Sequence, residues 1–196
     1  MPADFPIASY TSIHSRITAQ PPSDTLAEFE DAWRGLAYRF NAFDEACNAF
    51  DAAATADAQD AALFSVFSNG VACIECCCYG LFVIGALTQP EKFPLTSPTD
   101  KRNATVGATL RLFGEAFHDT ELTRLLFWWL NSREFGWWKE GRATLAQRVA
   151  PRTPEGWQVR GVTLNAAVLQ QKRAWLVELL MRLLAGTDEF VGSLHH

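Results

Sequence analysis

The chain has 196 residues, of which 48% are hydrophobic and 20% are charged, and its formal net charge at pH 7 is −5. These fractions are typical of a folded globular domain and exclude an intrinsically disordered chain. The length fits a single domain with its own hydrophobic core, and we find no internal repeat.

Residues 1–22 mix prolines and charges with isolated apolar residues, and no basic segment precedes an apolar one. We therefore predict an irregular N-terminal arm without a secretory signal, which favours a cytoplasmic protein. Ser23 and Asp24 then offer an N-cap with an acid in the first turn. Because apolar residues follow at spacings of three, four and seven, we predict a long helix that ends near Ala54.

The most apolar stretch runs from Ala61 to Leu87 and predicts a second long helix. Wound at 100° per residue, it places eight residues in one broad stripe: Leu63, Phe67, Gly70, Val71, Ile74, Cys78, Leu81 and Gly85. Four residues lie behind the stripe: Ser65, Ser68, Ala72 and Cys76. The run approaches the length of a membrane span, but Asn69 and Glu75 lie near its centre. We expect the central helix of a bundle and no membrane.

Glu75 is the only acid in this apolar run. An ionised carboxylate is costly to bury, so Glu75 must lie at the edge of the stripe, meet a cation, or be held neutral. This makes Glu75 the best single pointer to a functional site.

Three cysteines of the same helix could share one face, because they stand at i, i+3 and i+4: Cys73, Cys76 and Cys77. Cys47 or His118 could complete a metal site with them, but the chain lacks the second pair of ligands that structural zinc sites use. We predict buried apolar cysteines, no metal and no cofactor. Disulfides between such close neighbours are excluded by geometry, which again favours the cytoplasm. The terminal His195 and His196 are no evidence for a metal.

After Leu87 the chain holds three prolines, so residues 88–103 predict a loop that ends in the basic tip Lys101-Arg102-Asn103. We predict four further helices, at Thr105–Phe117, Asp119–Asn131, Arg133–Val149 and Leu164–Leu184. Asp119 is expected to cap the second of these, and the last is expected to end at Gly186.

No segment alternates convincingly between apolar and polar residues, and residues 149–163 predict a loop. The predicted fold is an all-α bundle with two long N-terminal helices and shorter C-terminal helices. Residues 23–186 form its single domain, and residues 187–196 form a C-terminal tail.

The two halves of the chain differ in charge. Residues 1–100 hold four Lys or Arg against 13 Asp or Glu, whereas residues 101–196 hold 13 against nine. Six of the seven tryptophans lie in the basic half, and basic residues among aromatics suit RNA through phosphate contacts and stacking. The alternative is that the basic half packs on the acidic half, with the tryptophans in the core.

A later helix carries the sequence Arg142-Ala143-Thr144-Leu145-Ala146-Gln147-Arg148. Together with the two long helices, the acid in the second and the proline-rich loop, this resembles the HEPN superfamily (higher eukaryotes and prokaryotes nucleotide-binding domains) over most of residues 24–184. The resemblance implies an α-helical bundle, a homodimer and, for many members, a metal-independent ribonuclease. The family signature is an Arg followed after four to six residues by a His, often with Asn beside the Arg. Arg142 takes the place of that Arg, Ala143 replaces the Asn and Gln147 replaces the His.

The replacement by Gln147 bears on catalysis, because histidine titrates near neutrality and glutamine does not. We therefore predict a non-catalytic nucleotide- or RNA-binding domain rather than an enzyme. Arg142 could hold a phosphate or pair with Glu75 from a facing helix. The predicted binding surface comprises Glu75, Arg142, Gln147, Arg148, Lys101, Arg102 and Asn103.

Two alternatives stay open. The first is a protein–protein interaction module that uses exposed aromatics between Trp128 and Trp138. The second is an active ribonuclease, because Arg111 is followed after six residues by His118, which makes this pair a second match to the signature. His118 is then the only candidate acid or base.

Overall fold

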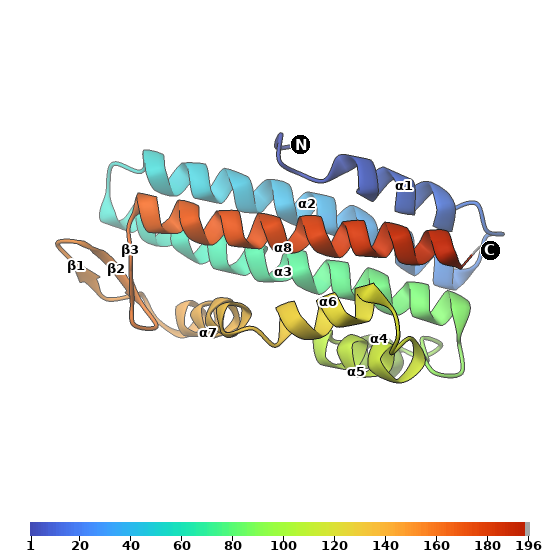
Figure 1. Ribbon diagram of the computed structural model, residues 1–196. Coiled ribbons are helices and arrows are strands. Elements are labelled where there is room, and N and C mark those ends of the chain that lie inside the picture. Colours follow the sequence, from blue (N-terminus) through green and yellow to red (C-terminus); the bar gives the residue numbers. More distant parts are fainter. Residues whose placement is uncertain (195–196) are drawn as a thin grey trace.

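The computed structural model describes residues 1–194 and confirms the all-α class (Figure 1). Two long helices, α2 (Asp24–Ala52) and α3 (Ala56–Thr88), form a hairpin joined by three residues. The side chain of Ser23 caps α2 by accepting from the amide of Leu26, and Thr55 caps α3 through the amide of Ala58. The two predicted long helices are therefore confirmed.

Helix α3 is the centre of the bundle, and all eight residues of its predicted stripe are buried. The four residues predicted behind the stripe are only partly buried. By length and composition α3 could cross a membrane, but 72% of its most apolar window is buried against the rest of the chain. A helix at the core of a bundle meets the same criteria.

The predicted irregular N-terminal arm is wrong for residues 7–17, which form α1 (Ile7–Ile17). Tyr10 and Trp33 of α2 hold it in place, because each side chain donates to the backbone carbonyl of the other, at 3.1 and 3.0 Å. Ile13 and Ile17 are fully buried. A helix this short depends on such tertiary contacts more than on its own propensity, which explains why periodicity did not reveal it.

The predicted loop over residues 88–103 ends in a short helix, α4 (Pro98–Asn103). The Ser97 hydroxyl accepts from the amide of Asp100 at 3.1 Å, and the Asp100 carboxylate accepts from the amide of Ser97 at 2.8 Å. This capping box starts the helix, and Pro98 at its first position needs no amide partner. The predicted loop is therefore wrong for residues 98–103.

The next helices are α5 (Val106–Ala116), α6 (Glu121–Leu130) and α7 (Arg133–Gln147), close to the predicted bounds. The cap of α6 is Thr120 rather than the predicted Asp119. Figure 1 shows α4, α5 and α6 along one end of the α2–α3 hairpin and α7 along the other.

Residues 149–163 are not a simple loop, because they contribute to a small antiparallel sheet of β1 (Arg152–Thr153), β2 (Gly156–Val159) and β3 (Val162–Leu164). Trp157 pairs with Leu164, and Val159 pairs with Val162. Trp157, Val159 and Leu164 are buried against the bundle. Strands of two to four residues are too short to give a readable alternation, so the sequence did not reveal them.

The last helix, α8 (Ala166–Ser193), has 28 residues, close to the 29 of α2 and the 33 of α3. It lies along both of these helices (Figure 1). It does not end at Gly186 as predicted. A Cβ at Gly186 would lie 2.9 Å from a methyl of Leu125 in α6, so this glycine permits close packing inside the helix. Residues 187–193, predicted as a tail, are helical and bury Phe190 and Val191. His195 and His196 lie outside the described residues.

Candidate functional site

Glu75 of α3 lies at the edge of the apolar stripe and meets Arg142 of α7. The guanidinium donates from Nη1 to Oε2 at 2.7 Å and from Nη2 to Oε1 at 2.8 Å, which is a bidentate pair. The side chains remain 43% exposed for Glu75 and 35% for Arg142. Of the three options that the sequence left open for Glu75, the structure thus shows two, the edge of the stripe and a cation, and both carboxylate oxygens accept from Arg142.

The other predicted site residues fall into two further places. Gln147 and Arg148 are exposed at the C-terminal end of α7, about 7.5 Å along the helix axis from Arg142. Lys101, Arg102 and Asn103 form the second half of α4. Lys101 pairs with Glu28 of α2, and Arg102 donates to the hydroxyl of Thr99 at 3.0 Å.

A pocket of about 400 Å³ joins Glu75 to residues 104–106, which directly follow the predicted basic tip. Tyr79 lines this pocket and donates to Glu28 at 2.7 Å. Hydrogen bonds from Lys101 and Tyr79 lower the pKa of the Glu28 carboxyl, whereas burial and the bond to Glu28 raise the pKa of Tyr79. These contacts hold α4 on α2 and α3.

The cysteines are free thiols, and four of the five are buried: Cys47, Cys73, Cys77 and Cys78. Burial raises the pKa of Cys77 to about 12 and moves those of Cys73 and Cys78 in the same direction. Thiols of this kind are poor nucleophiles and poor metal ligands. Within residues 1–194 no three His, Cys, Asp or Glu side chains come together as a metal site.

The largest hollow in the basic half lies between α7, the β2–β3 turn and the start of α8, with a volume of about 1060 Å³. We call it the α7 cleft, and its lining residues are Arg133, Glu134, Gly136, Trp137, Glu140, Arg160, Gly161, Val162 and Lys172. Arg133, Trp137 and Glu140 are four and three residues apart, so they share one face of α7. Arg142 lies about 140° around the helix from Trp137, so its pair with Glu75 belongs to a different face.

The α7 cleft contains three cations and two carboxylates. Lys172 donates to Glu134 at 2.8 Å, and Arg160 donates to Glu140 from Nε at 2.9 Å and from Nη2 at 2.6 Å. Arg133 forms no ion pair with any residue in the described part of the chain. The cleft therefore keeps an excess positive charge.

Trp137 forms the wall of the cleft. Its indole N–H donates to the carbonyl of Val159 at 3.3 Å, and the ammonium of Lys172 lies 4.5 Å from its ring centroid. The facing turn holds Arg160 at φ 50° and Gly161 at φ 76°, as a two-residue hairpin with positive φ at both positions requires. An arginine in this conformation costs about 1 kcal/mol, and the turn thereby carries its guanidinium to the cleft.

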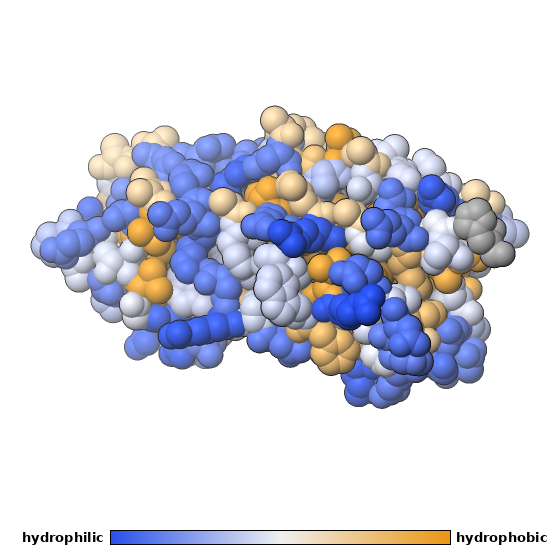
Figure 2. Space-filling view, viewed as in Figure 1, coloured by the Kyte–Doolittle hydropathy of each residue, from blue (hydrophilic) through white to orange (hydrophobic). Residues whose placement is uncertain are grey.

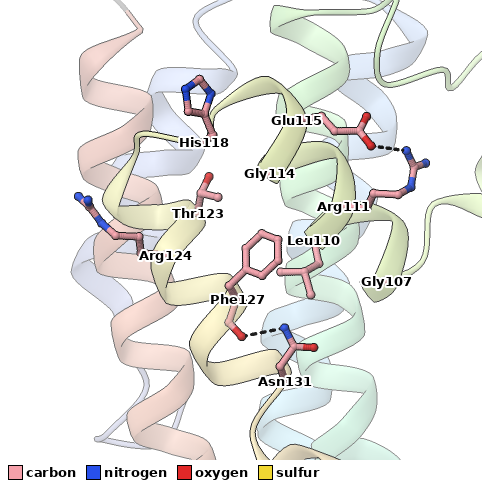
Figure 3. Close-up of a pocket in the computed structure, with 10 residues that line it drawn as sticks. All are labelled: Gly107, Leu110, Arg111, Gly114, Glu115, His118, Thr123, Arg124, Phe127 and Asn131. Carbon is pink, nitrogen blue, oxygen red and sulfur yellow. Dashed lines mark hydrogen bonds and ion pairs between the residues drawn. The ribbon is translucent and has the colours of Figure 1, made fainter.

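A second hollow of about 560 Å³ lies between α5 and α6 (Figure 3). We call it the α5/α6 groove, and it is lined by Gly107, Leu110, Arg111, Gly114, Glu115, His118, Thr123, Arg124, Phe127 and Asn131. Figure 3 shows the Phe127 ring pointing into the space between the two helices, toward Leu110. Charged side chains flank this apolar centre on the outer sides of both helices.

Arg111 and His118, the candidate ribonuclease pair, both line this groove. The Arg111 guanidinium turns outward to Glu115 at 2.9 Å, and His118 Nε2 lies 2.9 Å from a carboxylate oxygen of its neighbour Asp119. Both side chains are mostly exposed. Both residues line the groove, but each is paired with a different acid.

The fold and these hollows define the protein as a helical bundle with a charged cleft and an apolar groove. A scan against protein-family models finds no match, and neither curated proteins nor solved structures give one.

Sequence reasoning did not select Arg133, Arg160 and Lys172, which the structure gathers with Trp137. The available signal was the local charge balance, since nine basic and three acidic residues lie between Leu122 and Arg173. That count does not reveal which cations remain free. Arg142 forms an ion pair with Glu75, and Arg173 forms ion pairs with Asp4 and Asp44. These pairs fit the alternative in which the basic half of the chain packs on its acidic half.

Proposed function

We propose that this protein is a cytoplasmic, non-catalytic HEPN-like domain that binds nucleotides or RNA in the α7 cleft. The observation that supports the proposal is the gathering of Arg133, Arg160 and Lys172 around Trp137, with one more cation than carboxylate. The volume of about 1060 Å³ is ample for a nucleotide.

Each group of the cleft has a role in this binding. Arg133 is free to contact a phosphate, and its planar guanidinium can donate to two phosphate oxygens at once. Arg160 is paired at the surface, where an ion pair contributes little, so it can exchange Glu140 for a phosphate. Trp137 and Val162 supply an apolar wall for a base or a sugar.

Binding without cleavage follows from the chemistry of the cleft. Transfer of the 2′-hydroxyl proton needs a group that titrates near neutrality. The lining residues of the cleft include no histidine, and Gln147 cannot serve. Arginine and lysine can hold a phosphate, but they do not accept the proton of the 2′-hydroxyl, because both stay protonated at neutral pH.

The test is the fluorescence anisotropy of a labelled single-stranded RNA of about ten nucleotides, measured with chelator present. If three cations contact phosphates, affinity falls roughly 20-fold between about 50 and 200 mM salt. Arg133→Ala is expected to weaken binding about tenfold, because it removes a charge-assisted contact. Gly136→Leu is a second variant, since the space in front of Gly136 is open and a leucine would fill the cleft.

The matched control is Gly107→Leu, which fills the open end of the α5/α6 groove and leaves the cleft untouched. RNA binding that is absent, insensitive to salt, or unchanged by both Arg133→Ala and Gly136→Leu would remove the proposal. Cleavage of the RNA that is lost in His118→Ala would instead favour the ribonuclease alternative.

A further inference from the structure

The wall of the α7 cleft carries two carboxylates, those of Glu134 and Glu140, beside its three cations. A carboxylate repels a phosphate, so neither of them helps to bind the phosphate of a nucleotide. In a cleft that binds nucleotides, each carboxylate therefore has another role. The two differ in their partners and in their exposure, and these differences separate the roles.

Glu134 holds another side chain of the cleft in place. Its carboxylate accepts from the Lys172 ammonium at 2.8 Å, and the two side chains are only 27% and 19% exposed, respectively. The same ammonium lies 4.5 Å from the centroid of the Trp137 ring. Glu134 thus keeps Lys172 against Trp137 and offers little surface to a ligand.

Glu140 is more accessible, with 58% of its side chain exposed. Arg160 donates to it from both Nε and Nη2, but both bonds end on the same oxygen, Oε2. The other oxygen, Oε1, can accept from a ligand. When Arg160 exchanges Glu140 for a phosphate, Oε2 becomes free as well, and Glu140 then offers two acceptors next to each other.

Glu140 lies about one helical turn after Trp137, on the same face of α7. Side chains three residues apart on a helix have Cβ atoms about 5–6 Å from each other, so the Glu140 carboxylate can reach the edge of a base that lies against Trp137. The space beside Gly136 is open, because a Cβ there would meet no atom within 4 Å. A base therefore has room on this wall.

The four bases of RNA offer different groups to a carboxylate at their Watson–Crick edges. Guanine presents two adjacent donors, N1–H and the N2 amino group, which match the two carboxylate oxygens. Adenine and cytosine each present one amino group beside a ring nitrogen that accepts, and uracil presents one N–H between two carbonyls. These acceptors repel a carboxylate, so guanine is the base that gives Glu140 two hydrogen bonds.

We propose that the α7 cleft selects guanine nucleotides, with Glu140 accepting from N1–H and from the N2 amino group of the base. This inference rests on the proposed function, since it needs a phosphate on the cations and a base against Trp137. A bidentate contact distinguishes one base from another by about fivefold to 100-fold. Glu140 is more than half exposed, so we expect a preference for guanine over adenine of about five- to tenfold.

Fluorescence anisotropy of labelled RNA strands of about ten nucleotides tests the preference. One strand holds only adenine, and the others carry guanine, inosine or 7-deazaguanine at the same central position. Guanine should bind tighter than adenine, and inosine, which lacks the N2 amino group, should fall between them. 7-Deazaguanine keeps the Watson–Crick edge and should bind as guanine does. Weaker binding of 7-deazaguanine would place the contact on N7, which arginine reads, and would overturn the role of Glu140.

Glu140→Gln separates base recognition from charge. Its amide offers one acceptor and one donor, which match the edge of adenine better than that of guanine. The variant should bind the adenine strand at least as tightly as wild type and should lose the preference for guanine. The matched control is Glu134→Gln, which removes the same charge from the cleft but should keep the ratio of guanine to adenine affinity.

Two failures are distinguishable. A ratio of guanine to adenine affinity that stays near one in wild type, or that survives Glu140→Gln, overturns this inference, and the proposed function stands if Arg133→Ala still weakens binding. If no strand binds, both fall. A guanine preference that disappears when the central nucleotide is 2′-deoxyguanosine would assign Glu140 to the ribose hydroxyl and would also overturn the inference.

Discussion

The α7 cleft and the α5/α6 groove are both hollows beside surface helices, but they arrange charge and apolar surface in opposite ways. In the cleft charged side chains line the walls together with Trp137, and their ion pairs connect different elements of the fold. In the groove the centre is apolar, and the ion pairs connect neighbouring turns of one helix.

This difference decides what each hollow can bind. Cations that line a hollow with one charge in excess favour a compact anion, because the walls exclude part of the solvent screening. Outward pairs of zero net charge give no preference for an anion but can match a second protein surface. Figure 2 shows one face of the molecule, on which hydrophilic residues cover most of the surface and apolar residues form separate patches.

The helices beside the two hollows also differ in how firmly they are packed, and one glycine in α7 and one in α5 test this. A Cβ at Gly141 would lie 2.2 Å from the Phe67 ring, which Trp137 and Trp138 hold in the core. We expect Gly141→Ala to lower the free energy of unfolding by about 2 kcal/mol, because α7 must move away from α3. Chemical denaturation measures this loss, and RNA binding should weaken with it.

Gly114→Ala is the corresponding change in the groove. Its Cβ would lie 2.9 Å from the end of the Phe127 ring, which is half-exposed and free to swing. The helix gains up to about 1 kcal/mol from alanine, so stability should stay equal or rise. A loss as large as that of Gly141→Ala would contradict the view that the groove is loosely packed.

The sequence predicted the packing of the long helices because their apolar spacing is regular over many turns. It located α2 and α3, and all eight residues of the predicted stripe are among the 17 that α3 buries. It did not reveal α1, α4 or the small sheet. Each of these elements is short, and the contacts that hold it leave no regular apolar spacing in the sequence. Helix α1 depends on the Tyr10–Trp33 hydrogen bonds to α2, and α4 depends on its Ser97 capping box.

For the site, the sequence contained one clear signal, the single acid Glu75 in an apolar run, and left three options for it: the edge of the stripe, a cation or a neutral form. The structure shows Glu75 at the edge, paired with Arg142. The α7 cleft offered no such anomaly, because Arg133, Arg160 and Lys172 are ordinary residues of a basic segment. Their proximity depends on the β2–β3 turn, which was predicted as a loop.

The Glu75–Arg142 pair offers a further test, because it fastens α7 to α3 without facing the cleft. We expect Arg142→Ala to lower the free energy of unfolding by about 1 kcal/mol, a modest value because both side chains are partly exposed. RNA affinity should change less than twofold, in contrast to Arg133→Ala. Thermal denaturation and anisotropy on the same protein separate the two effects.

The control for this change is Arg34→Ala, since Arg34 is 77% exposed and pairs only with Asp31 on its own helix. It should alter stability by a few tenths of a kcal/mol at most. A large drop in RNA affinity for Arg142→Ala would move the binding site from the α7 cleft to the Glu75 face.

The smallest expected effect concerns the ion pair between Lys101 of α4 and Glu28 of α2, which holds α4 on the bundle. Lys101 and Tyr79 lower the pKa of Glu28, so folding favours the ionised carboxylate. The stabilisation is fully present above the ordinary glutamate pKa of about 4.3 and is lost as the pH falls through the lower pKa of the folded state. Glu28→Gln should therefore be less stable than wild type by a few tenths of a kcal/mol near pH 6, and the difference should vanish in acid, once the pH lies well below the pKa of Glu28 in the folded state. Denaturation at both pH values measures it, and a difference that persists in acid would show that Glu28 acts through packing rather than charge.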